Sequence, residues 1–300
     1  MTKSQAVTVS AARQLPAFEL AAILVVCIWG VNFVFLKIAL AEFDVVVFNL
    51  LRFGAMVLLG WLVLLWQKRR AGFSIRIERR DHLRLALSGL FGFTFYISLS
   101  MVGVNLSTGF SAALLVTTAP LWAALLLSAL KLEKISRRRA AGLVIAFLGV
   151  AVFVGEAGAQ VGLGDLVNLV AAFCYAAYNV VNKPLNRKYP PTVLTAWTLT
   201  IGAVPVIILS TPFLARQDWS RVSGGGWEIL AWSVVMPVYL AWTIWSWVSG
   251  KLGVSRTTAF MFLVPVVGGI TAIALTGERF GLLKLAGAGL ILGGMLVLRD

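Results

Sequence analysis

Stretches of about twenty mostly apolar residues recur along this chain, and they constrain its fold more than any other feature. A helix needs about 20 apolar residues to cross a hydrocarbon core of roughly 30 Å, and it satisfies its backbone hydrogen bonds internally. Ten such segments occur, at residues 18–39, 45–66, 83–102, 109–130, 139–154, 163–182, 193–214, 227–249, 257–276 and 282–298. The sequence therefore predicts an all-α polytopic membrane protein with ten transmembrane helices.

Charge placement agrees with a membrane protein and argues against nucleic-acid binding. Hydrophobic residues make up 60% of the 300 residues and charged residues only 13%, unlike ordinary soluble domains. The net charge of +14 has a topological explanation, because 20 of the 26 Lys and Arg residues fall on segments that are cytoplasmic if the chain begins inside, against four on the outer segments. The positive-inside rule then predicts that both termini are cytoplasmic, with membrane lipids and no nucleic acid as partners.

The two halves of the chain resemble each other at an offset of 145 residues. This register lays TTAPLWAALLLSALKLE, residues 117–133, on FLVPVVGGITAIALTGE, residues 262–278, without a gap. It pairs residues of the same type over two segments and their loop: Pro120 with Pro265, Glu133 with Glu278, Gly142 with Gly287, and Gly149 with Gly294. The coincidence of these residue types at one offset indicates an internal repeat.

The repeat predicts a transporter. Each half holds five segments, an odd number, so the second half enters the membrane from the opposite side. We expect two inverted five-helix repeats, residues 1–157 and 158–300, in one integrated membrane domain. Inverted repeats can exchange inward-open and outward-open shapes around a central site, which is the basis of alternating access.

The repeated prolines and glycines suggest mechanical roles. A proline inside a helix frees the carbonyl four residues earlier, which for Pro120 and Pro265 would be that of Val116 and of Met261. Each proline is either a hinge or a static kink, and the two readings are about equally supported. Six glycines of the fifth and tenth segments are expected to serve close helix packing: Gly142, Gly149, Gly287, Gly289, Gly293 and Gly294.

The interior of the predicted helices is aromatic and neutral. No Asp or Glu falls in the central part of any segment, which disfavours proton-coupled export of cationic drugs. Aromatic rings with hydroxyl and amide groups suit a ligand that has an apolar body and a few hydrogen-bonding groups, such as an amino acid. A single polar or aromatic side chain in such an interior is more often an interhelical hydrogen-bond partner or a packed ring. The prediction of a substrate site therefore rests on the clustering of many such side chains.

Two cationic side chains also fall within the segments. Lys37 and Arg52 are placed toward the outer side, where a long side chain can snorkel to water. The alternative is that one of them attracts a substrate carboxylate at the outer mouth.

The sequence gives little support to an enzymatic function. Ser111 lies two residues after Gly109, a pattern also found in some intramembrane serine proteases, but no His or Lys in a neighbouring segment could activate it. The only histidine, His82, lies in a basic loop, and there is no HExxH motif. We expect no catalytic residues, no cofactor and no metal.

Several motifs resemble the EamA family of the drug/metabolite transporter superfamily. They are WGVNFVFLK in the first segment, FNLLRFGAM around Arg52, and a proline followed by a loop Glu and AGxxxxxxG. The segments FCYAAYNVVNK and VYLAWTIWSWVSGKLGV are similar to those of bacterial aromatic amino acid exporters of the YddG type.

This resemblance implies ten helices around a central cavity in a bacterial inner membrane. It implies export of aromatic or hydrophobic amino acids and related metabolites; broad-specificity drug or metabolite efflux is the alternative. We expect a monomer and, since no intramembrane carboxylate is recognisable, facilitated diffusion as the simpler mode of transport. The cavity residues that it implies are Asn32, Tyr96, Ser111, Thr118, Tyr175, Tyr178, Tyr239 and Trp242.

Overall fold

The computed structural model describes residues 3–72, 74–132, 135–155, 162–252 and 260–299, and every regular element within these ranges is helical. The first half comprises α1 (Lys3–Ala39), α2 (Val45–Ala71), η1 (Arg79–Asp81), α3 (His82–Gly89), η2 (Leu90–Phe95), α4 (Tyr96–Leu106), α5 (Gly109–Val116), α6 (Ala119–Ala129) and α7 (Arg137–Gly155). Elements η1 to α4 form the third span, and α5 with α6 forms the fourth. Glu133 and the predicted boundary between the repeats, residues 157 and 158, lie outside the described residues.

The second half begins with α8 (Leu163–Asn186). It continues through α9 (Pro191–Ser210), η3 (Thr211–Arg216), η4 (Trp219–Arg221), α10 (Gly224–Val234), η5 (Val235–Leu240), α11 (Ala241–Leu252), η6 (Phe260–Leu263), α13 (Val264–Thr276) and α14 (Leu282–Arg299). Elements α10, η5 and α11 form the eighth span, and η6 with α13 forms a shorter apolar helical stretch.

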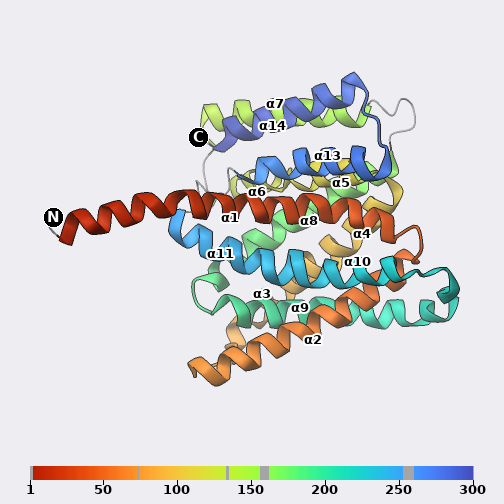
Figure 1. The fold of residues 1–300 in the computed structure, drawn as a ribbon, viewed down its shortest axis with the longest axis horizontal. Helices are drawn as coiled ribbons and strands as arrows, with labels where there is room; N and C mark the ends of the chain where they lie inside the picture. The colour runs from red at the N-terminus through yellow and green to blue at the C-terminus, as the bar shows by residue number, and fades with distance from the viewer. Residues whose placement is uncertain (1–2, 73, 133–134, 156–161, 253–259, 300) are drawn as a thin grey trace.

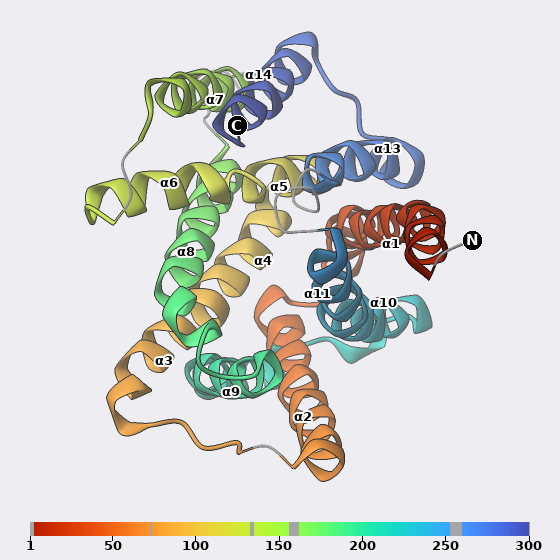
Figure 2. The ribbon, with the colours of Figure 1, turned by 90° about the vertical axis from the view of Figure 1, so that its left-hand side faces the viewer.

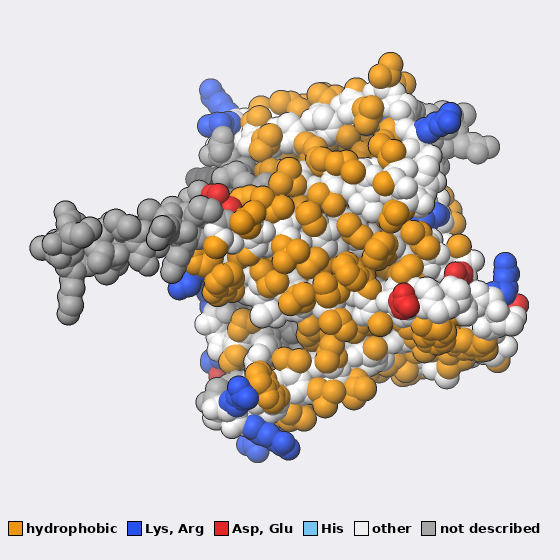
Figure 3. Space-filling view, in the orientation of Figure 1, with side chains coloured by type: hydrophobic (Ala, Val, Ile, Leu, Met, Phe, Trp, Pro, Cys, Tyr) orange, Lys and Arg blue, Asp and Glu red, His pale blue; other side chains and the backbone are white. Residues whose placement is uncertain are grey.

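These helices form a bundle with the character of a polytopic membrane protein. Eight helical stretches of the described chain are long and apolar enough to cross a membrane, and two shorter apolar helices span Phe260–Thr276 and Leu282–Val297. The helices run roughly along one direction, and α1 begins at the same end of the bundle at which α14 finishes (Figure 1). Apolar side chains cover the visible middle of the bundle, while Lys and Arg gather toward its two ends (Figure 3). The expected all-α membrane class is confirmed.

Element boundaries repeat at the same 145-residue offset as the sequence. Helices α6 and α13 begin at Ala119 and Val264, and α7 and α14 begin at Arg137 and Leu282. The third and eighth spans each contain a π-helical turn, η2 and η5, and these also begin 145 residues apart. π-Helical turns are rare and occur mostly as single bulges within α-helices. Their matching positions show that the offset relates backbone geometry as well as residue types.

Helices α7 and α14 pack as a pair at one side of the bundle (Figure 2). A Cβ on Gly287 would lie 2.6 Å from the Phe153 nitrogen, and one on Gly294 would lie 2.4 Å from the Ala146 nitrogen and 2.6 Å from the Gly142 oxygen. Only glycine allows the two backbones to come this close. The packing role predicted for Gly149, Gly287 and Gly294 is confirmed, and the Gly142 carbonyl lies against Gly294; the prediction is wrong for Gly289 and Gly293, which have nothing within 4 Å of a Cβ.

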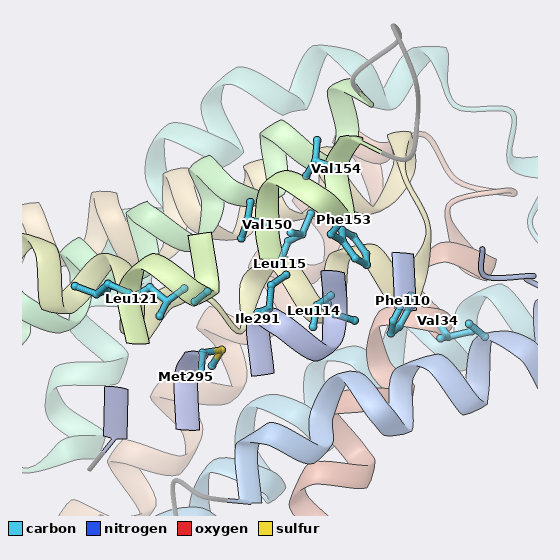
Figure 4. Packing of buried hydrophobic residues seen from close by; sticks show 14 residues of the cluster. Val34, Phe110, Leu114, Leu115, Leu121, Val150, Phe153, Val154, Ile291 and Met295 are labelled. Atoms are coloured by element: carbon cyan, nitrogen blue, oxygen red, sulfur yellow. The ribbon is translucent and has the colours of Figure 1, made fainter. Parts of the chain in front are cut away.

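A buried apolar cluster ties this pair to the rest of the bundle. Phe110, Leu114 and Leu115 of α5 meet Phe153 of α7 and Ile291 of α14, each less than a tenth exposed (Figure 4). Full burial of a Leu, Ile or Phe side chain contributes about 1.5–3 kcal/mol when it leaves water. Within a membrane, dispersion contacts and close packing provide most of this cohesion. The cluster fixes α5 at the centre of the molecule.

The fourth span is broken just before its proline. Helix α5 ends at Val116, Thr117 and Thr118 form a turn, and α6 then begins with Pro120 in its first turn. A proline in the first turn costs no hydrogen bond, because the first amides of a helix have no helical partner. Pro265 occupies the same position in α13, directly after η6. The prediction that each proline lies inside a continuous helix is therefore wrong; both stand where a new helix starts.

Candidate substrate site

One face of α8 carries polar and aromatic side chains that pack against the third span. Asn168, Tyr175, Tyr178 and Asn182 recur at spacings of seven, three and four residues, which places them on one side of the helix. At its two ends this face is held by hydrogen bonds. Asn168 Nδ2 donates to Ser107 Oγ at 3.0 Å, and Ser88 Oγ donates to Asn182 Oδ1 at 3.1 Å.

Three of the predicted site residues meet in the middle of this face. The ring centroids of Tyr96 and Tyr175 are 4.6 Å apart, and those of Tyr175 and Tyr178 are 5.9 Å apart and stacked. Phe93 adds a fourth ring, 6.0 Å from Tyr178. Gly92 makes room for them, because a Cβ there would lie 2.4 Å from the Tyr178 ring. We call Tyr96, Tyr175 and Tyr178 the tyrosine cluster; all three are half-buried.

The predicted residues of the eighth span lie against other helices. The Tyr239 hydroxyl donates to the Met56 carbonyl of α2. Trp242 is 43% exposed and meets Trp29 of α1 edge-on, with centroids 5.9 Å apart. Trp29 Nε1 in turn donates to the Pro237 carbonyl at 3.0 Å. No described contact joins these two residues to the tyrosine cluster.

The remaining predicted residues are buried in the first half. Ser111 lies in the first turn of α5, where the Thr108 side chain accepts a hydrogen bond from its amide and caps the helix. The Thr118 hydroxyl donates to the Leu115 carbonyl at 2.6 Å, in the break of the fourth span. Asn32 is 7% exposed, and its Oδ1 atom has no hydrogen-bond partner. A buried polar atom of this kind requires an explanation, such as a bound ligand.

Arg52 is buried, and the prediction that it snorkels to water is wrong. Its side chain is 7% exposed, and Nη2 donates to the Ser233 carbonyl of α10 at 3.2 Å. Lys37, by contrast, donates to the Asn105 carbonyl at 2.6 Å and stays partly exposed. The sequence placed both cations at similar depths, but neighbouring helices cover only Arg52.

Polar groups link the two halves at each end of the bundle. At the end where α1 begins, Lys188 Nζ lies 2.7 Å from Glu78 Oε2 and 2.6 Å from Asp81 Oδ2, and the Tyr189 hydroxyl donates to the same Asp81 oxygen. The hydrogen bond from Lys188 lowers the pKa of the Glu78 carboxyl. Burial opposes the charged form of Lys188, but its bonds to Asp81 and Glu78 outweigh burial and raise its pKa.

The link at the opposite end uses Glu42. Its carboxylate accepts hydrogen bonds from the Ser223 amide at 2.8 Å and from the Ser223 hydroxyl at 2.9 Å. Gln217 lies beside it, accepting from the Asp44 amide at 2.7 Å and donating to the Glu42 carbonyl at 3.3 Å. These contacts join the loop after α1 to the segment that precedes α10.

The sequence prediction missed Asn168, Asn182 and Phe93. The two asparagines could have been found from the helical period that they share with Tyr175 and Tyr178. Phe93 could not, because its contact depends on how the third span packs against α8. No group of three or more potential metal ligands occurs among the described residues.

Comparison with known proteins decides the family. The model of the EamA-like transporter family matches twice, over residues 17–155 and 162–299. The chain belongs to the EamA-like transporter family. The two matches divide the chain into two copies of one unit, here called the first and second copies, which agrees with the internal repeat of the sequence.

Individual relatives of this EamA protein are similar over most of their length. An uncharacterized transporter, YyaM, of Bacillus subtilis is 25% identical over 82% of this chain and 81% of its own. A protein named as a probable amino-acid metabolite efflux pump, from Salmonella typhimurium, is 28% identical over 92% of each chain. A solved crystal structure aligns with a TM-score of 0.63 and 18% identity over 94% of this chain and 97% of its own, which shows a shared fold. This EamA protein is a multi-pass membrane transporter.

Proposed function

We propose that this transporter exports aromatic or hydrophobic amino acids and related metabolites from the cytoplasm. The tyrosine cluster is the observation that carries the proposal, because three half-buried rings with hydroxyl groups suit a substrate with an apolar body and a few polar groups. The Salmonella relative, named as a probable amino-acid metabolite efflux pump, supports the same substrate class.

The proposed mechanism is alternating access between two copies of opposite orientation. The link through Lys188 at one end and the link through Glu42 at the other each join the first copy to the second. Opening one link while the other stays closed would expose a central site to one side of the membrane at a time. The eight predicted cavity residues are proposed to line that site.

Facilitated diffusion down an outward gradient is the proposed mode of transport. No Asp or Glu lies in the middle of the predicted segments, where an intramembrane carboxylate would exchange protons for substrate. We place the protein in a bacterial inner membrane as a monomer, with both termini cytoplasmic, on the basis of its bacterial relatives and its 20 Lys and Arg residues against four.

Broad-specificity drug or metabolite efflux is the second candidate. Exposed tryptophans of the eighth span favour it, since Trp242 is 43% and Trp247 is 50% exposed, and such surfaces accept varied aromatic compounds. Cells that express the protein would then resist cationic dyes without any change in amino-acid efflux.

Flux through purified protein in liposomes tests the proposal. Vesicles are loaded with one labelled amino acid from a panel that includes Phe, Trp, Leu, Ser and Lys, and efflux is followed with and without a proton gradient. We expect faster efflux of Phe and Trp than of Ser or Lys, and no dependence on the proton gradient. Absence of flux for the whole panel contradicts the proposal, and flux only with the gradient contradicts facilitated diffusion.

A further inference from the structure

Arg52 places a buried positive charge inside the molecule. It lies on α2, and its side chain reaches across to Ser233 of α10, so it connects the first copy to the second. Taking a guanidinium out of water costs several kcal/mol unless hydrogen bonds and an opposite charge compensate. Charged residues inside membrane segments therefore usually mark a function.

The groups that contact the Arg52 guanidinium carry no negative charge. Nε and Nη2 both donate to the Ser233 carbonyl, at 3.4 and 3.2 Å, and Nη1 lies 3.7 Å from the Met101 sulfur. A thioether is a weak acceptor, and one carbonyl cannot use the five N–H groups of a guanidinium. No carboxylate lies within ion-pair distance of Arg52 among the described residues.

Pro237 explains why the Ser233 carbonyl is available. The amide of residue 237 would close the α-helical hydrogen bond to that carbonyl, and proline has no amide hydrogen. The same residues enter the π-helical turn η5, where the backbone is wider than in an α-helix. The Ser233 carbonyl accepts from Arg52 at the edge of this turn, and Arg52 can leave it when a stronger acceptor arrives.

Asn49 adds an unsatisfied polar atom near Arg52. Asn49 lies one helical turn earlier on α2, and its Nδ2 donates to Ser98 Oγ of α4 at 3.0 Å. The Asn49 Oδ1 atom is buried without a partner, and Asn49 is only 5% exposed. Both Arg52, through Met101, and Asn49, through Ser98, contact α4, the helix that begins with Tyr96 of the tyrosine cluster.

We propose that Arg52 binds the carboxylate of the transported substrate, whose apolar side chain lies against the tyrosine cluster. This rests on the function proposed above and deepens it, since it names the substrate as a compound with a free carboxylate. The carboxylate takes the place of the Ser233 carbonyl, and the guanidinium then forms two parallel charge-assisted hydrogen bonds. The unpartnered Oδ1 atom of Asn49 is an acceptor for the ammonium group of an α-amino acid.

Replacement of the Ser233 carbonyl by the substrate carboxylate also connects substrate binding to movement of the helices. The bond from Arg52 to Ser233 joins the two copies, and a substrate that captures Arg52 breaks it. Binding therefore weakens the contact between α2 and α10 at the moment when the site is filled. A compound without a carboxylate leaves the contact intact.

Phenylalanine and phenylalaninamide provide the test, because they share the ring and the amine and differ in the carboxylate. With wild-type protein in liposomes, we expect efflux of the amide to be slower by about tenfold or more, as charged hydrogen bonds of this kind contribute strongly. Arg52→Gln should slow phenylalanine efflux by a similar factor and leave amide efflux unchanged. Arg216→Gln is the matched control, since Arg216 is exposed in η3, and both fluxes should stay at wild-type values.

The outcomes separate this inference from the proposed function. Equal wild-type efflux of both compounds overturns the carboxylate site while the exporter stands, and so does equal slowing of both in folded Arg52→Gln protein. Absence of efflux for every compound overturns both. Should Arg52→Gln fail to fold, the thermal midpoint of purified wild-type protein decides: phenylalanine must raise it at concentrations where phenylalaninamide does not, and equal shifts overturn the inference.

Discussion

Gly149 of α7 lies so close to α14 that a Cβ atom on it would sit 2.5 Å from the Ile291 amide nitrogen. The obstacle is backbone, which cannot turn aside as a flexible side chain can. Glycine therefore sets the separation between α7 of the first copy and α14 of the second.

Substitution of Gly149 by Ala should destabilise this pair of helices. Overpacking at a rigid contact costs roughly 1–3 kcal/mol, and we expect a lower thermal midpoint for the detergent-solubilised protein. Gly289→Ala is the control, because it adds the same methyl group to α14 where nothing lies within 4 Å. Its midpoint should be unchanged or slightly higher, since alanine favours helices. Equal decreases of the thermal midpoint in both variants would contradict the close contact between Gly149 and Ile291.

Tyr175 is the central ring of the tyrosine cluster, and its removal should impair transport more than folding. Tyr175→Ala deletes both ring contacts, to Tyr96 at 4.6 Å and to Tyr178 at 5.9 Å. A ring contact with the substrate contributes about 0.5–1.5 kcal/mol, and its loss corresponds to roughly two- to tenfold slower Phe efflux. Trp66→Ala, at an exposed ring near the end of α2, should leave efflux unchanged. Wild-type efflux in Tyr175→Ala would remove this residue from the site.

The broken fourth span allows a direct test of hinge motion. Pro120→Ala supplies an amide that can bond to the Val116 carbonyl, so the turn at Thr117 and Thr118 can become helical. If the break moves during transport, turnover should fall several-fold while the substrate concentration for half-maximal flux stays constant. Pro205→Ala, inside α9, is the control. Wild-type turnover in both Pro120→Ala and Pro265→Ala would show that neither proline is a hinge.

The link through Lys188 predicts how stability depends on pH. Because the pKa of Glu78 is lowered in the folded protein, the link stabilises the fold above the ordinary glutamate value of 4.5 and weakens as pH falls through the lowered value. We expect Glu78→Gln to reduce the thermal midpoint at pH 6–8, and the difference from wild type to shrink as the pH falls below 4.5 and through the lowered pKa. Glu228→Gln, at an exposed position on α10, should match wild type at every pH. If the thermal midpoints of Glu78→Gln and wild type differ by the same amount at every pH, the link through Lys188 is not the cause of the difference.

The positions of the spans followed from the sequence because the length and hydropathy of a segment are local properties. Helix starts such as Arg137 and Leu282 also repeat at the sequence offset. The break after Val116 could not be predicted, because the same residues suit a continuous helix with a kink and only packing around α5 decides between the two. The π-helical turn at Leu90–Phe95 has no proline or other local signature.

The candidate site was predictable only in part. Tyr96, Tyr175 and Tyr178 were chosen as polar aromatic residues within spans, and the structure brings them together. Tyr239 and Trp242 were chosen on the same grounds but face α2 and α1. The period of a helix shows which residues share a face, but not which neighbour covers that face. For the same reason, burial of Arg52 could not be inferred from its depth in the segment.

The matching π-helical turns bear on the history of this chain. A wide turn is easily lost, since removing one residue restores the ordinary α-helix. Its presence at Leu90–Phe95 and again at Val235–Leu240 is most simply explained if one ancestral five-helix unit already had it before the gene was duplicated. Two units of this kind would have paired with each other before they were joined, so the bulge began as part of a dimer whose two subunits now form a single polypeptide.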